Sequence, residues 1–305
     1  MTGKSKIKGR ISSTGLVLAA AIWGFAFVIV KDSLSSIGAV WMVAFRFSIA
    51  AVLLAIIYIK KLIKADVLYW KSGIAAGLLL FTAYLTQTIG CDYTTAGKNA
   101  FLTTIYVILI PLFNWPLYKK RPAFYVFIAA VMSVTGIGML ALNGQEGSLA
   151  VMNRGDILTL VCGIFYALHI IFMAHCSQKQ DPILLTVIQF IFAAAFGWLC
   201  APFYDGEFPL KALKNIQTVL SMVYLGVFST LVCFVLQNVC LKYVNSALAS
   251  LFLSLESVFG VIFSTILLHE SLSPRMFIGC VLIFSAILLA EVVPKIAAHD
   301  KTCAA

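Results

Sequence analysis

Apolar residues in this chain fall into long stretches that short polar segments separate. The stretches lie near residues 12–30, 37–59, 72–92, 96–115, 123–142, 155–175, 182–203, 217–240, 246–268 and 275–294. A helix needs about 20 residues to cross a bilayer core of about 30 Å, and these stretches have about that length. They are too long and alternate too little for the strands of a membrane barrel. The pattern predicts an all-α polytopic membrane protein with ten transmembrane helices.

The first five stretches recur in order as the second five. At one constant offset, for example, Trp23 aligns with Tyr166. Five spans is an odd number, so the second copy must enter the membrane in the opposite orientation. The sequence therefore predicts a 5+5 inverted-topology repeat, made of residues 1–142 and 143–305. Inverted repeats place the substrate site near the bilayer midplane, where the halves meet.

Composition and charge agree with a membrane location. Hydrophobic residues make up 62% of the chain and charged residues 11%, which is too little polar surface for a soluble globule. Lys and Arg concentrate in the N-terminal segment and around residues 60–71 and 119–121. The positive-inside rule then places both termini in the cytoplasm. The formal net charge of +10 is explained by topology and by contact with membrane lipids, and we expect no nucleic-acid partner.

No motif of enzyme chemistry stands out. Most of the eight cysteines lie in or beside the apolar stretches, and no Cys/His spacing typical of a metal site occurs. A phosphate-binding loop and a serine nucleophile elbow are both absent from the sequence. We expect a protein that is not an enzyme and that has no metal or cofactor.

Several short motifs resemble a known family. They are Ala21-Ile22-Trp23-Gly24, Arg46-Phe47, Cys91-Asp92-Tyr93-Thr94-Thr95-Ala96-Gly97, Leu225-Gly226-Val227-Phe228-Ser229-Thr230 and Leu255-Glu256-Ser257-Val258-Phe259. Together they resemble the drug/metabolite transporter superfamily, in its ten-helix branch with two EamA domains. The resemblance implies an inner-membrane carrier of small metabolites, often an exporter, with a central cavity between its halves. The family often has Glu-Pro where this chain has Glu256-Ser257, so a proline-associated bend is not expected here.

Polar and aromatic residues near mid-membrane are candidates for substrate binding. Tyr84 and Gln87 lie one helical turn apart, and so do Tyr166 and His169. Such groups would orient a small polar or amphipathic solute in an apolar pocket. The alternative is a packing or helix-bridging role, above all for His169 and for the aromatic residues. The candidate substrate-binding residues are Trp23, Tyr84, Gln87, Tyr106, Tyr166, His169 and Gln237, the last being the repeat mate of Gln87.

Two charged residues lie near the middle of apolar stretches, where ionisable groups are costly and need partners. Glu256 is near the centre of its stretch, and could couple transport to protons or lock two helices together. Arg46 aligns with Gln189 in the repeat, which favours a structural role for this intramembrane charge. If Arg46 paired with Glu256, the case for proton coupling would weaken.

The sequence thus predicts a secondary-active or facilitative transporter of small metabolites such as amino-acid-like, nucleoside-like or drug-like solutes. The expected direction is export, by alternating access through a midplane cavity, in a monomer or homodimer. The alternative is a non-transporting integral membrane protein, either an intramembrane enzyme or a receptor-like scaffold.

Overall fold

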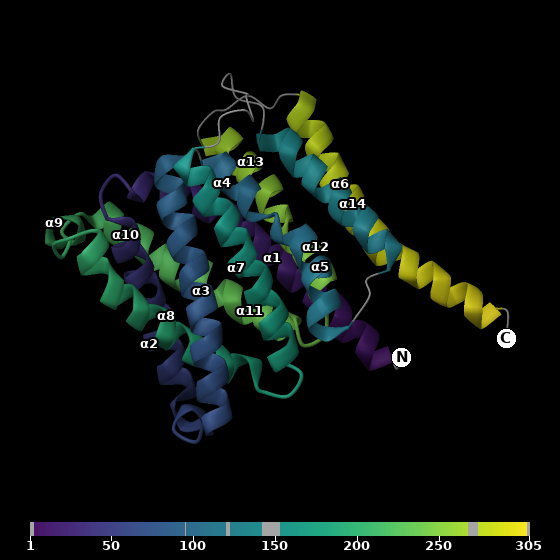
Figure 1. Cartoon of the computed structure of the whole chain (residues 1–305), viewed down its shortest axis with the longest axis horizontal. Coiled ribbons are helices and arrows are strands. Elements are labelled where there is room, and N and C mark those ends of the chain that lie inside the picture. Colours follow the sequence, from purple (N-terminus) through teal and green to yellow (C-terminus); the bar gives the residue numbers. More distant parts are fainter. Residues whose placement is uncertain (1–2, 95, 120–122, 142–152, 268–273, 304–305) are drawn as a thin grey trace.

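The computed structural model describes residues 3–94, 96–119, 123–141, 153–267 and 274–303, and the regular structure within these ranges is helical, with no strand (Figure 1). Six segments are long and apolar enough to cross a membrane. They are α1 (Gly3–Ser33), α2 (Ala39–Leu62), α3 (Val67–Tyr93), α7 (Arg154–Cys176), α8 (Pro182–Tyr204) and the series α10 (Ile216–Tyr224), η1 (Leu225–Val232) and α11 (Cys233–Cys240). The chain is therefore a multi-pass helical membrane protein.

The other apolar helices are shorter or interrupted. They are α4 (Ala96–Thr103), α5 (Tyr106–Tyr118), α6 (Phe124–Ala141), α12 (Ser246–Leu253), α13 (Leu255–Leu267) and α14 (Pro274–Cys303), whose apolar part is Phe277–Ala290, while α9 (Leu210–Leu213) is a single turn. Two of the predicted spans, 96–115 and 246–268, are each divided into two consecutive helices. The count of ten spans stays a prediction.

Local hydrogen bonding accounts for both divisions. At the first, the amides of Ile105 and Val107 bond to carbonyls three residues back, those of Leu102 and Thr104, at 3.3 and 3.0 Å. At the second, the amide of Ser257 bonds to the Ser254 carbonyl at 3.2 Å. Such bonds tighten the helix locally and change its direction. Hydropathy cannot predict them, because it does not depend on which carbonyl an amide donates to.

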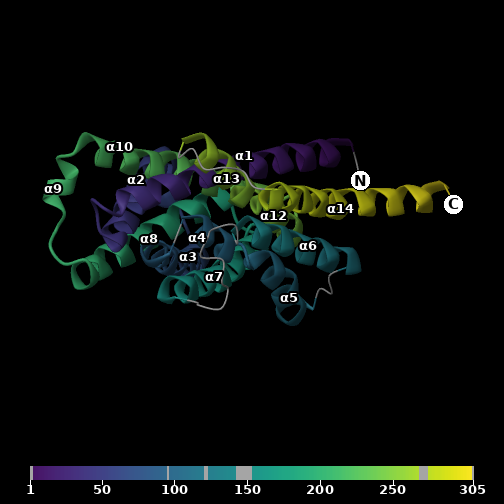
Figure 2. The same cartoon turned by 90° about the horizontal axis from the view of Figure 1, so that it is seen from above.

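Helices from distant parts of the chain pack in pairs. α2 packs against α8 and α6 against α14, while α1 contacts α11 and α13, and α7 contacts α3 and α5. Figures 1 and 2 show α6 and α14 running side by side at one edge of the molecule. In both views the described ends of α1 and α14 leave the bundle on the same side.

A glycine sets the approach of α1 to α13. A Cβ atom at Gly24 would lie 2.7 Å from both the amide nitrogen of Gly260 and the Cβ of Phe259. The same atom would lie 2.8 Å from the carbonyl oxygen of Glu256. Only a residue without a side chain fits, and small residues are the usual means of close helix contact in membranes. This contact holds Glu256 at a fixed depth beside α1.

The outer surface is apolar, as a lipid-facing surface must be. Ile57 is 71% exposed and Phe203 is 88% exposed, and many other large apolar side chains share this exposure. In a soluble protein such a surface would be an aggregation liability. Here it meets lipid tails.

One ion pair ties two predicted cytoplasmic loops together. The Lys61 ammonium lies 2.7 Å from the Asp181 carboxylate, which also accepts hydrogen bonds from the amides of Ile183 and Leu184 at the start of α8. Partial burial opposes ionisation of Asp181, but the bonds from Lys61 and from these amides outweigh it and hold the carboxyl pKa below its ordinary value of 3.8.

Candidate substrate cavity

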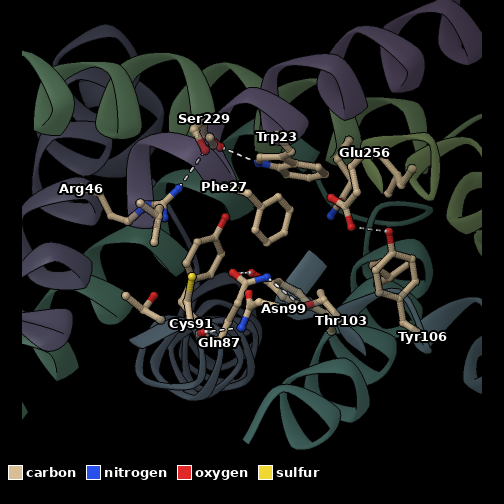
Figure 3. Close-up of a pocket in the computed structure, with 18 residues that line it drawn as sticks. Trp23, Phe27, Arg46, Gln87, Cys91, Asn99, Thr103, Tyr106, Ser229 and Glu256 are labelled. Atoms are coloured by element: carbon tan, nitrogen blue, oxygen red, sulfur yellow. Dashed lines mark hydrogen bonds between the residues drawn. The ribbon is translucent and has the colours of Figure 1, made fainter. Parts of the chain in front are cut away.

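A cavity lies at the centre of the bundle, with an empty volume of about 570 Å³ that includes its open mouth. Its walls come from α1, α2, α3, α4, α5, α7, η1, α11, α12 and α13 (Figure 3). The lining residues are Trp23, Ala26, Phe27, Val30, Arg46, Tyr84, Gln87, Thr88, Cys91, Asn99, Thr103, Tyr106, Tyr166, Ile170, Ser229, Gln237, Leu253 and Glu256. Both halves of the chain therefore contribute to one cavity.

Arg46 forms one side of the cavity and is only 3% exposed. Its Nε donates to the Thr230 hydroxyl and its Nη2 to the Ser229 hydroxyl, each at 2.9 Å. The guanidinium also lies over the Tyr84 ring, 4.4 Å from the centroid, a cation–π contact. Three neighbours thus fix the orientation of this charge.

The two hydroxyls that bind Arg46 belong to the π-helical segment η1. The Thr230 hydroxyl donates onward to the Leu225 carbonyl, five residues earlier, at 2.7 Å. The Ser229 carbonyl accepts the indole N–H of Trp23 at 2.7 Å. The wider turn of a π-helix frees backbone groups for such contacts, and π-helical turns recur at functional sites. The segment fastens Arg46 and Trp23 to the same cavity wall.

Gln87 is the centre of a second network. The Tyr166 hydroxyl donates to its Oε1 and its Nε2 donates to the Thr103 hydroxyl, both at 3.2 Å. Asn99 donates its Nδ2 to the Gln87 carbonyl at 3.0 Å and to the Thr159 hydroxyl at 2.9 Å. The Oδ1 of Asn99 is buried and has no hydrogen-bond partner among the described residues. It is a buried, unpartnered acceptor in a residue that lines the cavity.

Glu256 lies across the cavity from Arg46, with the Phe27 ring between them in the view of Figure 3. The carboxylate accepts a hydrogen bond from the Tyr106 hydroxyl at 3.1 Å and is 5% exposed. Within the described residues, no ion pair joins it to Arg46. The pairing that would have weakened proton coupling is therefore not present in this conformation.

Most of the sequence candidates converge on this cavity, but one does not. Trp23, Tyr84, Gln87, Tyr106, Tyr166 and Gln237 line it, together with Arg46 and Glu256. His169 is fully buried elsewhere: its Nε2 lies 2.9 Å from Gln189 Oε1 and its ring packs against Phe234. Although His169 lies one turn from Tyr166, the helix rotates its ring away from the cavity.

Sequence reasoning gave no role to several lining residues. Phe27, Asn99, Thr103 and Ser229 line the cavity but were not proposed as site residues. Apolar and small polar residues are common in membrane helices, so each alone is a weak signal. Ser229 was inside a motif that carries the family resemblance, and that motif was the one available clue.

Sequence comparison finds relatives that are described as uncharacterized transporters. The sequence profile of the EamA-like transporter family matches residues 11–142 and again residues 153–291. The chain belongs to the EamA-like transporter family. This confirms the resemblance inferred from the motifs.

Two relatives and one solved structure give the extent of the similarity. An uncharacterized transporter of Archaeoglobus fulgidus is 33% identical, over 95% of this chain and 88% of its own length. The uncharacterized transporter YvbV of Bacillus subtilis is 22% identical, over 92% of each chain. A protein of known crystal structure superposes with a TM-score of 0.76 at 15% identity, covering 93% of this chain and 97% of its own. The last similarity concerns the fold alone.

Proposed function

We propose that this chain is a secondary-active or facilitative carrier that exports small metabolites across the plasma (inner) membrane by alternating access. The observation that carries the proposal is the central cavity, because its walls come from both halves of the chain. A solute held there would contact groups whose relative positions change when the halves move. In this proposal the helices form ten spans in two five-helix repeats, residues 1–142 and 143–305, with both termini cytoplasmic.

Helix pairing supports the inverted repeat. If α1, α3 and α5 correspond to α7, α11 and α13, then the contact of α1 with α11 has its counterpart in the contact of α7 with α3. Likewise, the contact of α1 with α13 has its counterpart in that of α7 with α5. A two-fold axis would exchange α2 with α8 and α6 with α14. Each of these two contacting pairs then maps onto itself, as expected across such an axis.

The position of the cavity favours an outward-facing state. The lining residues of α1 and α3 include Val30 and Cys91, near the ends of these helices that charge assigns to the non-cytoplasmic side. On the opposite side of Tyr84, aromatic rings are packed together. The ring centroid of Phe47 lies 5.0 Å from that of Tyr84, and the ring centroid of Phe234 lies 5.8 Å from it. These packed rings would have to separate to open the cavity toward the cytoplasm.

Glu256 is the proposed coupling residue. A carboxyl couples proton movement to transport only if its proton affinity differs between the two states, because a ligand with equal affinity for both shifts nothing. The bond from Tyr106 offers such a difference: it joins α5 to α13, which belong to different halves. A rearrangement of the halves would break or remake it.

The test is a solute-flux assay on the purified full chain in liposomes. Liposomes that contain the wild-type chain should release preloaded metabolites faster than protein-free liposomes. A scaffold or an intramembrane enzyme would give no net flux. Glu256→Gln keeps an acceptor for the Tyr106 hydroxyl but removes the titrating group. It should retain exchange and lose any accumulation driven by a pH gradient. Wild-type flux that ignores an imposed pH gradient would remove the coupling role and leave the transport proposal standing.

A further inference from the structure

Arg46 is a buried cation whose charge has no carboxylate counterpart among the described residues. A guanidinium carries five N–H donors and is always charged in proteins. The structure gives Arg46 two hydrogen bonds, both to hydroxyls, and they involve Nε and Nη2. Hydroxyls and an aromatic ring solvate a charge without neutralising it. A buried charge of this kind is stabilised when an anion completes the site.

The guanidinium is held in a geometry that suits such an anion. The Thr230 hydroxyl donates to the Leu225 carbonyl, so its lone pairs face Arg46. The Tyr84 ring covers one face of the guanidinium plane. Further hydrogen bonds must therefore come from the N–H groups at the edge of that plane. The planar fork matches a carboxylate, which accepts two parallel N–H bonds. Because the fork is already oriented, binding would cost little side-chain entropy.

The charge on the ligand follows from the lining residues. Arg46 is the only Lys or Arg among them, and Glu256 is the only acid. A phosphate monoester would bring close to two negative charges to a site with a single cation. A carboxylate brings one. The cavity therefore favours a monoanion at the Arg46 side.

The far side of the cavity offers acceptors and the middle is apolar. The unpartnered Oδ1 of Asn99 and the Glu256 carboxylate both lie in the wall away from Arg46. Between the two charged groups, Figure 3 places the rings of Phe27 and Trp23. A ligand that satisfies the whole cavity would have an anionic end, an apolar body and a hydrogen-bond donor at its other end.

We propose that Arg46 binds the carboxylate of the transported solute, and that the solute is an amphipathic monocarboxylate with a hydrogen-bond-donating group at its far end. The inference rests on the proposed transport function and names the substrate class of that cavity. Arg46 is then a substrate-binding residue. The role expected from the sequence, a purely structural charge, would not require it to face the cavity.

The experiment measures equilibrium binding of matched probes to the purified full chain. The probes are 3-phenylpropionate, its neutral amide 3-phenylpropionamide, 3-(4-hydroxyphenyl)propionate and phenethylamine, in a thermal-shift titration followed by calorimetry. Wild type should bind 3-phenylpropionate about ten- to a hundredfold more tightly than the amide, the usual effect of charge-assisted hydrogen bonds. 3-(4-Hydroxyphenyl)propionate, whose phenol adds a donor at the end away from the carboxylate, should bind more tightly still, and phenethylamine should bind no better than the amide.

Arg46→Gln should abolish the preference for the carboxylate over the amide while amide binding remains. Because this variant might fold poorly, Ser229→Ala is a second test that keeps the charge and removes one bond that orients it. It should reduce the preference severalfold. Gln189→Met is the control: Gln189 aligns with Arg46 in the repeat but lies outside the cavity, so the preference should be unchanged.

Binding and flux separate the two proposals. An unchanged preference in Arg46→Gln, or a wild type that binds the acid and the amide equally or binds none of the probes, would overturn the carboxylate site even if metabolite flux is measured. Selective carboxylate binding without any flux would instead contradict the transport function and support the site.

Discussion

Substituting alanine for Gly24 should destabilise this protein, although helix propensity alone predicts the reverse. In a helix interior, alanine is favoured over glycine by about 1 kcal/mol. At Gly24, however, the added methyl would lie 2.7 Å from Gly260 N and 2.8 Å from Glu256 O. These are backbone atoms of α13, so α1 and α13 must move apart by several tenths of an ångström. Overpacking of this kind costs about 1–3 kcal/mol, so the net effect should be a loss of up to about 2 kcal/mol.

The control is the same substitution at Gly97, where a Cβ atom would meet nothing within 4 Å. Gly97→Ala should leave the stability unchanged or raise it slightly. Thermal unfolding in one detergent should therefore show a melting temperature several degrees lower for Gly24→Ala and no decrease for Gly97→Ala. Because the strained contact includes the backbone of Glu256, flux should also fall in the Gly24 variant. If Gly24→Ala unfolds at or above the wild-type temperature, the close contact between α1 and α13 is not as described.

Three further predictions concern other parts of the chain. Cysteine labelling should find residues 60–71 accessible from the cytoplasm and residues 205–214 from the opposite face, and labelling of both from one side would contradict the inverted repeat. His169→Leu should lower stability by about 1–3 kcal/mol, because it leaves a buried acceptor unpaired, with solute affinity unchanged; a loss of affinity in a stable protein would place His169 in the binding site. The depressed pKa of Asp181 contributes stability that is present above pH 3.8 and is lost as pH falls through the folded-state value; Asp181→Asn should remove this acid sensitivity, and an unchanged acid-unfolding profile would contradict the interaction with Lys61.

The helices themselves could be predicted because hydropathy reports which residues can lie in lipid. The six long spans fall where apolar stretches were expected, with ends set by caps that the sequence also contains, such as Asp66 before α3. The divisions at residues 104–105 and at Ser254 could not be predicted in this way. They depend on whether a few amides donate to the carbonyl three residues back or to the one four residues back. The packing around each helix determines which bond forms.

The cavity residues were partly predictable because repeat symmetry adds information to polarity. Gln87 and Gln237 aligned between the halves, and both line the cavity. His169 shows the limit of helical spacing: two residues one turn apart still differ in direction by about 60°. That angle is enough to put Tyr166 at the cavity and His169 against Gln189. Which side of a helix faces a cavity depends on its neighbours, and a single sequence does not contain them in usable form.

The residues on which the function is proposed to depend are those at which the two halves differ. Tyr106 and Glu256 are 150 residues apart and hydrogen-bonded to each other, and each follows the division of its own interrupted helix. One half thus supplies a phenol and the other a carboxylate at corresponding places. Arg46 and Gln189 differ in the same way, since one faces the cavity and the other pairs with His169.

This asymmetry has a consequence for energetics. Two identical halves would give inward- and outward-facing states of equal energy. A solute or a proton would then bind both states equally and would favour neither. Differences confined to the lipid-facing surface would not change with the state, because both states bury similar helix pairs. In the proposed mechanism, differences in the cavity would change with the state, because there the groups of one half would exchange partners with those of the other. The unequal pairs Arg46/Gln189 and Tyr106/Glu256 are therefore the positions at which ligand binding can favour one state over the other.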